Sequence, residues 1–136
     1  MPEQLIKATA LPRSARWHAE QRGRSRTAPA GIRRDGSFLL QLRCDLHWDR
    51  QAFSHLEKAM RQVCAQQETK DQLDRWLVEG YWYMADFVPS WTSHPNLPRP
   101  EPSEYYEAAL ERLHDIQTWF VTGRSPYMDT HVWADL

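Results

Sequence analysis

The placement of the nine prolines limits how this chain can fold more than any other feature of its sequence. No proline lies between Pro29 and Pro89, whereas five prolines fall within residues 89–102. Proline lacks an amide hydrogen and clashes with the preceding turn, so it is disfavoured inside a helix. The long proline-free stretch can therefore hold unbroken helices, and residues 89–102 are expected to form a stiff, extended connector after them.

A first helix is predicted over about residues 49–67. Asp49 has the position and chemistry of an N-cap, and Trp48 and Phe53 occupy the two positions of a hydrophobic staple. The apolar residues that follow recur with the period of a helix, which indicates one buried face.

Two more helices are predicted further along the chain. Thr69 and Gln72 have the spacing of a capping box, which predicts a second helix over about residues 70–88. A third helix is predicted over about residues 103–121, because an apolar stripe of helical period runs through it and Gly123 can end it.

Residues 38–48, ahead of the first helix, show a different pattern. Apolar residues occupy every second position, which is typical of a strand with one buried face. The turn-forming pair Asp35-Gly36 would let the residues before it form a hairpin with this strand. We therefore predict an α+β fold, mostly helical, in which a three-helix body carries a strand or hairpin at residues 31–48; an all-α bundle is the alternative. The alternating positions are Phe38, Leu40, Leu42, Cys44, Leu46 and Trp48.

Charge divides the chain into two unlike parts. Residues 1–36 hold eight Lys or Arg against three acidic residues, whereas residues 37–136 hold nine against fifteen. We predict a flexible basic arm over residues 1–30, a single globular domain over residues 31–122 and a C-terminal tail over residues 123–136. The arginines of the basic part can form bidentate contacts with phosphate or carboxylate groups; they are Arg13, Arg16, Arg22, Arg24, Arg26, Arg33 and Arg34.

Aromatic residues are concentrated between positions 79 and 96, in the sequence EGYWYMADFVPSWTSHPN. Three of them stand in succession, and successive residues of a helix point about 100° apart, so these three cannot all face one core. Exposed aromatic groups on a stiff segment are typical anchors of protein interfaces. We predict a partner-binding surface made of Trp82, Tyr83, Trp91 and His94.

No motif in the sequence identifies a catalytic or metal site, and no cofactor is expected. We expect a non-enzymatic interaction protein, such as an adaptor, a small subunit of a complex, or an inhibitor or immunity-type protein, that binds a protein partner or a second copy of itself. One alternative is a nucleic-acid-associated protein that uses residues 1–34. Another is a ligand-binding protein or enzyme with a pocket near Trp82, Trp91 and His94.

The sequence also bears on the compartment. Its two cysteines form no disulfide framework. No apolar run approaches the roughly 18 residues of a membrane span, and the N-terminus lacks the apolar stretch of a secretory signal. We therefore predict an intracellular, cytoplasmic protein with reduced thiols and no membrane segment.

Overall fold

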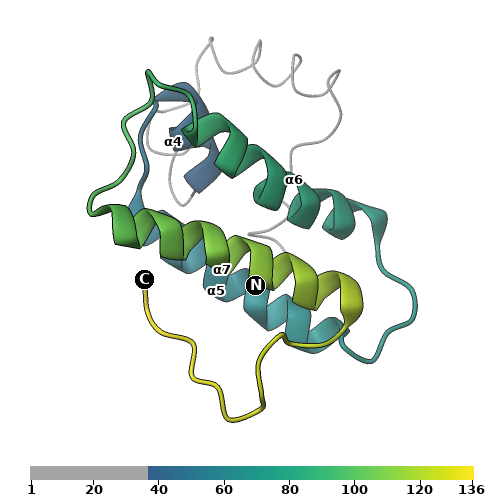
Figure 1. The fold of residues 1–136 in the computed structure, drawn as a ribbon. Coiled ribbons are helices and arrows are strands. Elements are labelled where there is room, and N and C mark those ends of the chain that lie inside the picture. Colours follow the sequence, from purple (N-terminus) through teal and green to yellow (C-terminus); the bar gives the residue numbers. More distant parts are fainter. Residues whose placement is uncertain (1–36) are drawn as a thin grey trace.

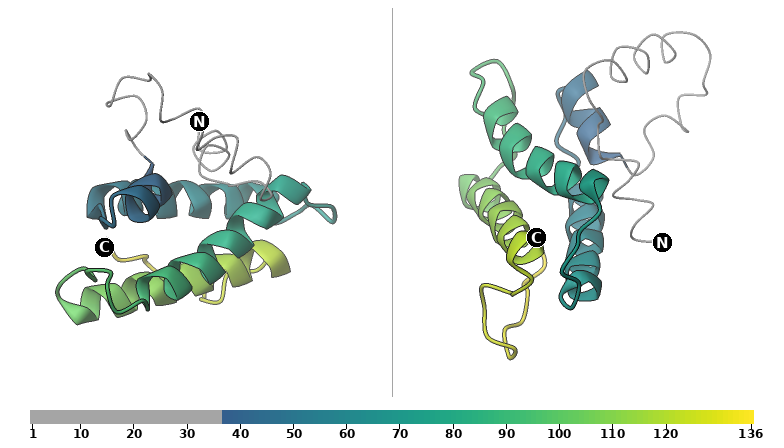
Figure 2. Two further views of the ribbon diagram at one scale, coloured as in Figure 1. Left: turned by 90° about the horizontal axis from the view of Figure 1, so that it is seen from above. Right: turned by 90° about the vertical axis from the view of Figure 1, so that its right-hand side faces the viewer.

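The computed structural model describes residues 37–136, and within them the chain forms four α-helices. Three long helices pack on one another, and a short helix lies beside the C-terminal end of one of them (Figure 1, Figure 2). The predicted basic arm, its seven arginines and the predicted Asp-Gly turn lie outside the described residues. The helices are α4 (Phe38–Cys44), α5 (Arg50–Gln67), α6 (Arg75–Thr92) and α7 (Ser103–Thr122).

The predicted strand is wrong, because residues 38–44 form helix α4 and the described residues contain no strand. The side chain of Ser37 caps this helix by accepting the amide N–H of Leu40 at 3.4 Å. A strand that buries its even-numbered face would expose Leu39, whereas Leu39 is only 1% exposed. The α+β class therefore fails for residues 37–136, and the all-α alternative fits.

The start of α5 agrees with the sequence pattern. Asp49 is the N-cap, and its carboxylate accepts the amide N–H of Ala52 at 3.0 Å. This hydrogen bond lowers the pKa of Asp49 below its usual value because it stabilises the charged form. The predicted staple is also present, since the rings of Trp48 and Phe53 lie 5.2 Å apart. Trp48 then reaches α7, where its indole N–H donates to the hydroxyl of Tyr105 at 3.0 Å.

The predicted capping box between α5 and α6 is wrong. Helix α6 begins at Arg75, five residues later than expected, and residues 69–74 form a loop. Contacts with α7 hold this loop at its start, because the indole N–H of Trp119 donates to the Glu68 carboxylate at 2.8 Å. Gly123 ends α7 in the left-handed conformation, and a side chain there would lie 3.3 Å from the Glu68 carbonyl oxygen.

Helix α6 also ends later than predicted, because it continues through Pro89 to Thr92. A proline at this position removes one hydrogen bond to the preceding turn, at a cost of about 3 kcal/mol in a helix interior. Tertiary contacts offset this cost. The buried Thr92 hydroxyl hydrogen-bonds the hydroxyl of Tyr106 on α7, and the indole N–H of Trp91 donates to the Leu42 carbonyl of α4. Within the helix, the Thr92 hydroxyl also donates to the Val88 carbonyl at 2.7 Å. These tertiary contacts cannot be recognised from a local sequence pattern, which therefore predicts that the helix ends at residue 88.

The core lies where α5, α6 and α7 meet. Tyr81 of α6 is fully buried there, and its ring stacks on Phe120 of α7 with centroids 4.0 Å apart. Its hydroxyl donates to the Met60 carbonyl of α5 at 2.6 Å, so one side chain contacts all three long helices. Burial raises the pKa of Tyr81, which keeps this hydroxyl in its donating form.

The C-terminal tail, residues 123–136, returns along α5 and α7 (Figure 1). Trp133 stacks on Trp119 with ring centroids 5.8 Å apart. The same ring lies 5.2 Å from the guanidinium of Arg61 and 5.1 Å from that of Arg112. Both arginines pair with the fully buried carboxylate of Glu57, at 2.8 and 3.0 Å. The tail therefore covers a charged cluster that would otherwise be open to water.

Our first prediction separates helix α4 from the expected strand. Replacing Leu39 with Ala should lower the free energy of unfolding by about 2–5 kcal/mol, because the helix buries this side chain fully. Replacing the exposed Cys44 with Ala should change it by less than about 0.5 kcal/mol. Denaturant unfolding of both variants measures the difference. The opposite ranking would favour the even-numbered buried face of a strand.

Our second prediction concerns the tail. Trp133→Ala should lower the free energy of unfolding by about 1–3 kcal/mol, because it removes a stacked ring pair and two cation–π contacts. The neighbouring Val132 is 84% exposed, so Val132→Ala serves as the control and should leave the melting temperature unchanged. Thermal melts of equal midpoint for the two variants would show that the tail does not stabilise the helices.

Candidate functional site

Three aromatic residues of α6, Tyr83, Phe87 and Trp91, form a stack that we call the aromatic ladder. Their spacing of four residues places them on one face of the helix, and successive ring centroids lie 4.8 and 5.4 Å apart. Arg43 of α4 donates to the Tyr83 hydroxyl at 2.6 Å, and its guanidinium lies 5.0 Å from the Phe87 ring. The indole N–H of Trp91 donates to the Leu42 carbonyl at 3.1 Å. The ladder therefore fastens α4 to α6.

The Tyr83 hydroxyl contributes to this contact between α4 and α6, because it accepts the hydrogen bond from Arg43. Burial raises the pKa of Tyr83, and this effect outweighs the opposite influence of the neighbouring Arg43 charge. The phenol is therefore retained in its neutral form, in which it accepts the hydrogen bond from Arg43.

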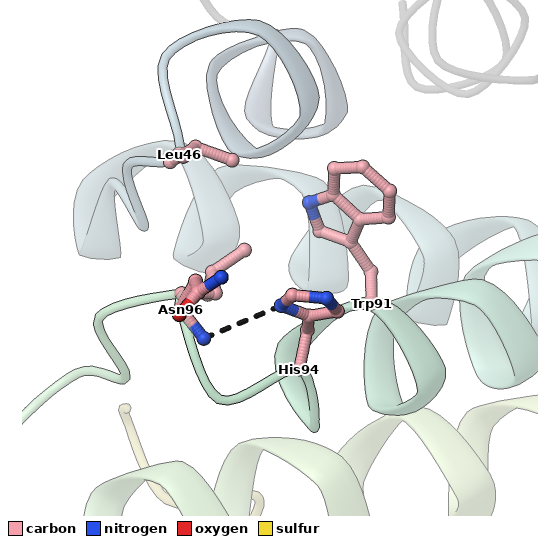
Figure 3. A pocket seen from close by; sticks show the side chains of 5 residues that line it. Leu46, Trp91, His94 and Asn96 are labelled. Carbon is pink, nitrogen blue, oxygen red and sulfur yellow. Dashed lines mark hydrogen bonds between the residues drawn. The ribbon is translucent and has the colours of Figure 1, made fainter.

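A pocket of about 210 Å³ lies at the Trp91 end of the aromatic ladder. Figure 3 shows the side chains around it, with Leu46 on the α4 side and His94 and Asn96 on the side of the connector that follows α6. The pocket thus joins segments that are about 50 residues apart in the sequence. Its lining residues are Leu46, Trp91, His94, Asn96 and Leu97.

Leu46 has an uncommon backbone conformation for its residue type. It follows the C-cap of α4 with a φ of 52°, in the left-handed region where helices commonly end on glycine. The turn is closed by the amide groups of Asp45 and His47, which both donate to the Gln41 carbonyl, at 3.0 and 3.2 Å. This conformation costs a residue with a side chain roughly 1–2 kcal/mol. The side chain gains little burial in return, because it is 43% exposed.

His94 lines the pocket and is exposed to solvent. Its Nδ1 accepts the backbone N–H of Asn96 at 3.3 Å (Figure 3). An imidazole that accepts through Nδ1 carries its proton on Nε2, so this ring can donate one hydrogen bond outward. The neighbouring Ser93 hydroxyl donates to the Ser90 carbonyl at 2.7 Å, so its proton is directed to the helix backbone and away from His94. The pair is therefore not arranged as a nucleophile with its base.

The connector holds its side of the pocket by hydrogen bonds to the end of α6. The Arg99 guanidinium donates to the carbonyls of Thr92 and Ser93, at 3.0 and 3.2 Å. It also lies 5.8 Å from the Tyr106 ring of α7. Leu97 of the connector is buried. The wall formed by the connector is thus preorganised before any ligand arrives.

The structure divides the four residues predicted to form one partner-binding surface. Trp91 and His94 line the pocket, and Tyr83 lies at the far end of the aromatic ladder, where it contacts α4. Trp82 is 58% exposed. It is nine residues from Trp91, which places it about half a turn away, on the opposite side of α6. The predicted residues are therefore parts of different faces.

Sequence reasoning missed three residues of the pocket: Leu46, Asn96 and Leu97. The alternating pattern places Leu46 on the buried face of the expected strand. The sequence does offer a signal for Leu97, because it is a large apolar residue between two prolines of the connector. An apolar residue in such a segment indicates that its side chain is buried. Leu46, which lies across the pocket from Leu97, could not be predicted because its position depends on the turn that follows α4.

Among residues 37–136, no group of three or more His, Cys, Asp or Glu side chains is placed to hold a metal ion. None of the helices in this range combines the length and apolar character that crossing a membrane requires. No protein-family model, curated protein or solved structure matches this chain. Fold and site together describe a helical protein with a small pocket at the junction of α4, α6 and the connector.

Our third prediction concerns the thiols. Cys64 is buried against the Ile116 carbonyl, and burial raises its pKa to about 12. It should therefore resist thiol reagents in the folded protein, since the thiolate is the reactive form. Cys44 is exposed and should react readily. Ellman's reagent should titrate one thiol in the native protein and two after denaturation, and Cys44→Ser should abolish the native reaction. Two fast thiols in the native protein would contradict this arrangement.

Proposed function

We propose that this protein is a non-enzymatic interaction protein that binds a protein partner by receiving one apolar side chain of that partner in the pocket between Leu46 and Trp91. The observation that carries this proposal is the conformation of Leu46. A half-exposed leucine occupies a position where glycine or asparagine would be favoured. Strained backbone conformations of this kind are concentrated at functional sites.

The size of the pocket supports a single side chain as its occupant. Sites for drug-sized ligands and cofactors commonly measure about 300–1,000 Å³, whereas this pocket measures about 210 Å³. A partner residue that enters it would contact the Trp91 ring and the buried Leu97. Apolar anchors that fill a preformed hollow are typical of interface hot spots.

The rim of the pocket supports contact with a polypeptide. His94 offers an N–H donor at Nε2, and the exposed Asn96 amide offers both a donor and an acceptor. Backbone carbonyl and amide groups of the partner, on either side of its inserted side chain, would form hydrogen bonds with His94 and Asn96. The connector is held by Arg99, so little conformational entropy is lost on binding.

The two alternative functions have weaker support. A nucleic-acid-associated protein would depend on residues 1–34, which lie outside the described residues. A ligand-binding protein or enzyme would use the same pocket, but Trp82 does not line it and Ser93 is not directed at His94. The small volume of the pocket favours a side chain over a free substrate.

Our fourth prediction tests the pocket through Leu46→Asn. Asparagine tolerates the left-handed conformation, so the free energy of unfolding should stay constant or rise by up to about 1 kcal/mol. Partner binding should weaken by about 2 kcal/mol or more, because the wall of the pocket is lost. Proteins recovered from the native host by the parent and the variant are compared by quantitative mass spectrometry, and self-association is measured by sedimentation.

The matched control is Val121→Asn, which removes another exposed apolar side chain from the last turn of α7, at the end of this helix away from the connector. It should retain the partner that Leu46→Asn loses. His94→Ala should weaken the same interaction to a smaller extent. The proposal is wrong if the parent, Leu46→Asn and Val121→Asn all recover the same proteins and self-associate equally.

A further inference from the structure

Helix α6 has a third face, which belongs neither to the core nor to the aromatic ladder. Trp82 occupies its centre and is 58% exposed. Glu79 lies three residues before it and Asp86 four residues after it. These spacings place both carboxylates beside the indole ring, one turn to each side. The face therefore combines a flat aromatic surface with two negative charges.

The two carboxylates have no cationic partner among the described residues, since no ion pair joins either of them to a residue within 37–136. Arg75 lies one turn before Glu79 and forms no ion pair with it. The stretch from Glu79 to Asp86 therefore presents two negative charges without an internal counter-ion from the described part of the chain.

Elsewhere in the molecule, arginine side chains already bind to a carboxylate and a tryptophan ring together. Arg61 and Arg112 each pair with the Glu57 carboxylate and also lie about 5 Å from the ring of Trp133. A guanidinium group is planar and weakly hydrated, so it can contact an aromatic face while it donates to a carboxylate. Trp82 with its flanking carboxylates supplies the ring and the acceptors for such a contact.

We propose that the face formed by Glu79, Trp82 and Asp86 is a second contact surface, which binds an arginine side chain from a basic segment of a partner protein. It is distinct from the pocket because Trp82 and Trp91 lie on opposite sides of α6. Complementary charge selects the partner: carboxylates attract a cationic segment and repel the phosphates of a nucleic acid. Arginine is favoured over lysine because only its planar group can stack on the indole.

The test uses the full-length protein with ¹⁵N-labelled tryptophan and a hexa-arginine peptide as the probe. The indole N–H signal of Trp82 is assigned by its disappearance in Trp82→Phe. The signal should shift on addition of peptide. The affinity should fall about two- to fivefold in Trp82→Ala, the range expected for an exposed cation–π contact. Hexa-lysine should bind more weakly than hexa-arginine at the same salt concentration.

A charge control separates this surface from general attraction to an acidic protein. Glu79→Gln with Asp86→Asn should weaken peptide binding more than Glu104→Gln with Glu107→Gln, which neutralises two exposed carboxylates of α7. An equal loss in the two double variants would overturn the proposal. Leu46→Asn should bind the peptide normally, so this surface can succeed or fail independently of the pocket.

The chain's own arginines provide a second control. In the absence of peptide, replacing Arg22, Arg24 and Arg26 with Gln should leave the Trp82 signal unchanged. A shift of that signal would show that the basic part of this chain occupies the surface and would overturn the assignment to a partner protein.

Discussion

The position of α6 depends on Tyr81. Its buried hydroxyl needs an acceptor, because an unpaired polar group in the core would be costly, and the Met60 carbonyl of α5 supplies one. Its ring is simultaneously stacked on Phe120 of α7. These two contacts hold α6 in one rotation about its own axis. That rotation turns the aromatic ladder toward α4 and leaves Trp82 facing solvent, so both proposed contact surfaces follow from a single core residue.

The pocket exists because two chain segments end abruptly beside each other. Helix α4 ends two residues before the left-handed Leu46, and α6 ends where Arg99 donates to the carbonyls of Thr92 and Ser93. Each ending is locally unfavourable: one uses a leucine where glycine fits better, and the other follows a proline within the helix. The contacts of Trp91 and Thr92 with neighbouring helices stabilise the last turn of α6. Binding sites typically combine a locally strained backbone with neighbouring contacts that hold it rigidly.

Contacts between arginine and aromatic rings recur through the described part of the chain. Arg43 joins α4 to α6, Arg50 lies 3.8 Å from the Tyr105 ring of α7, and Arg112 joins α7 to the tail. Each contact links segments that are distant in the sequence. In each case the guanidinium also forms a hydrogen bond, with Tyr83, with the Glu101 carbonyl and with Glu57 respectively. The protein thus uses arginine to connect its elements, and the face around Trp82 offers the same chemistry to an outside group.

The sequence by itself determined where α5 begins and where α7 ends, because the signals at these two points are local. The Asp49 cap, the Trp48–Phe53 staple and the terminating Gly123 each act within one or two turns and need no distant partner. Tertiary structure decided the rest. Residues 38–44 became helical because their apolar positions fit a helix as well as a strand and the buried Leu39 has its place in the core only in the helix, and α6 passed through Pro89 because neighbouring helices hold its last turn. The pocket could not be read from the pattern, since Leu46 and Leu97 meet only after α4, α6 and the connector have taken their places.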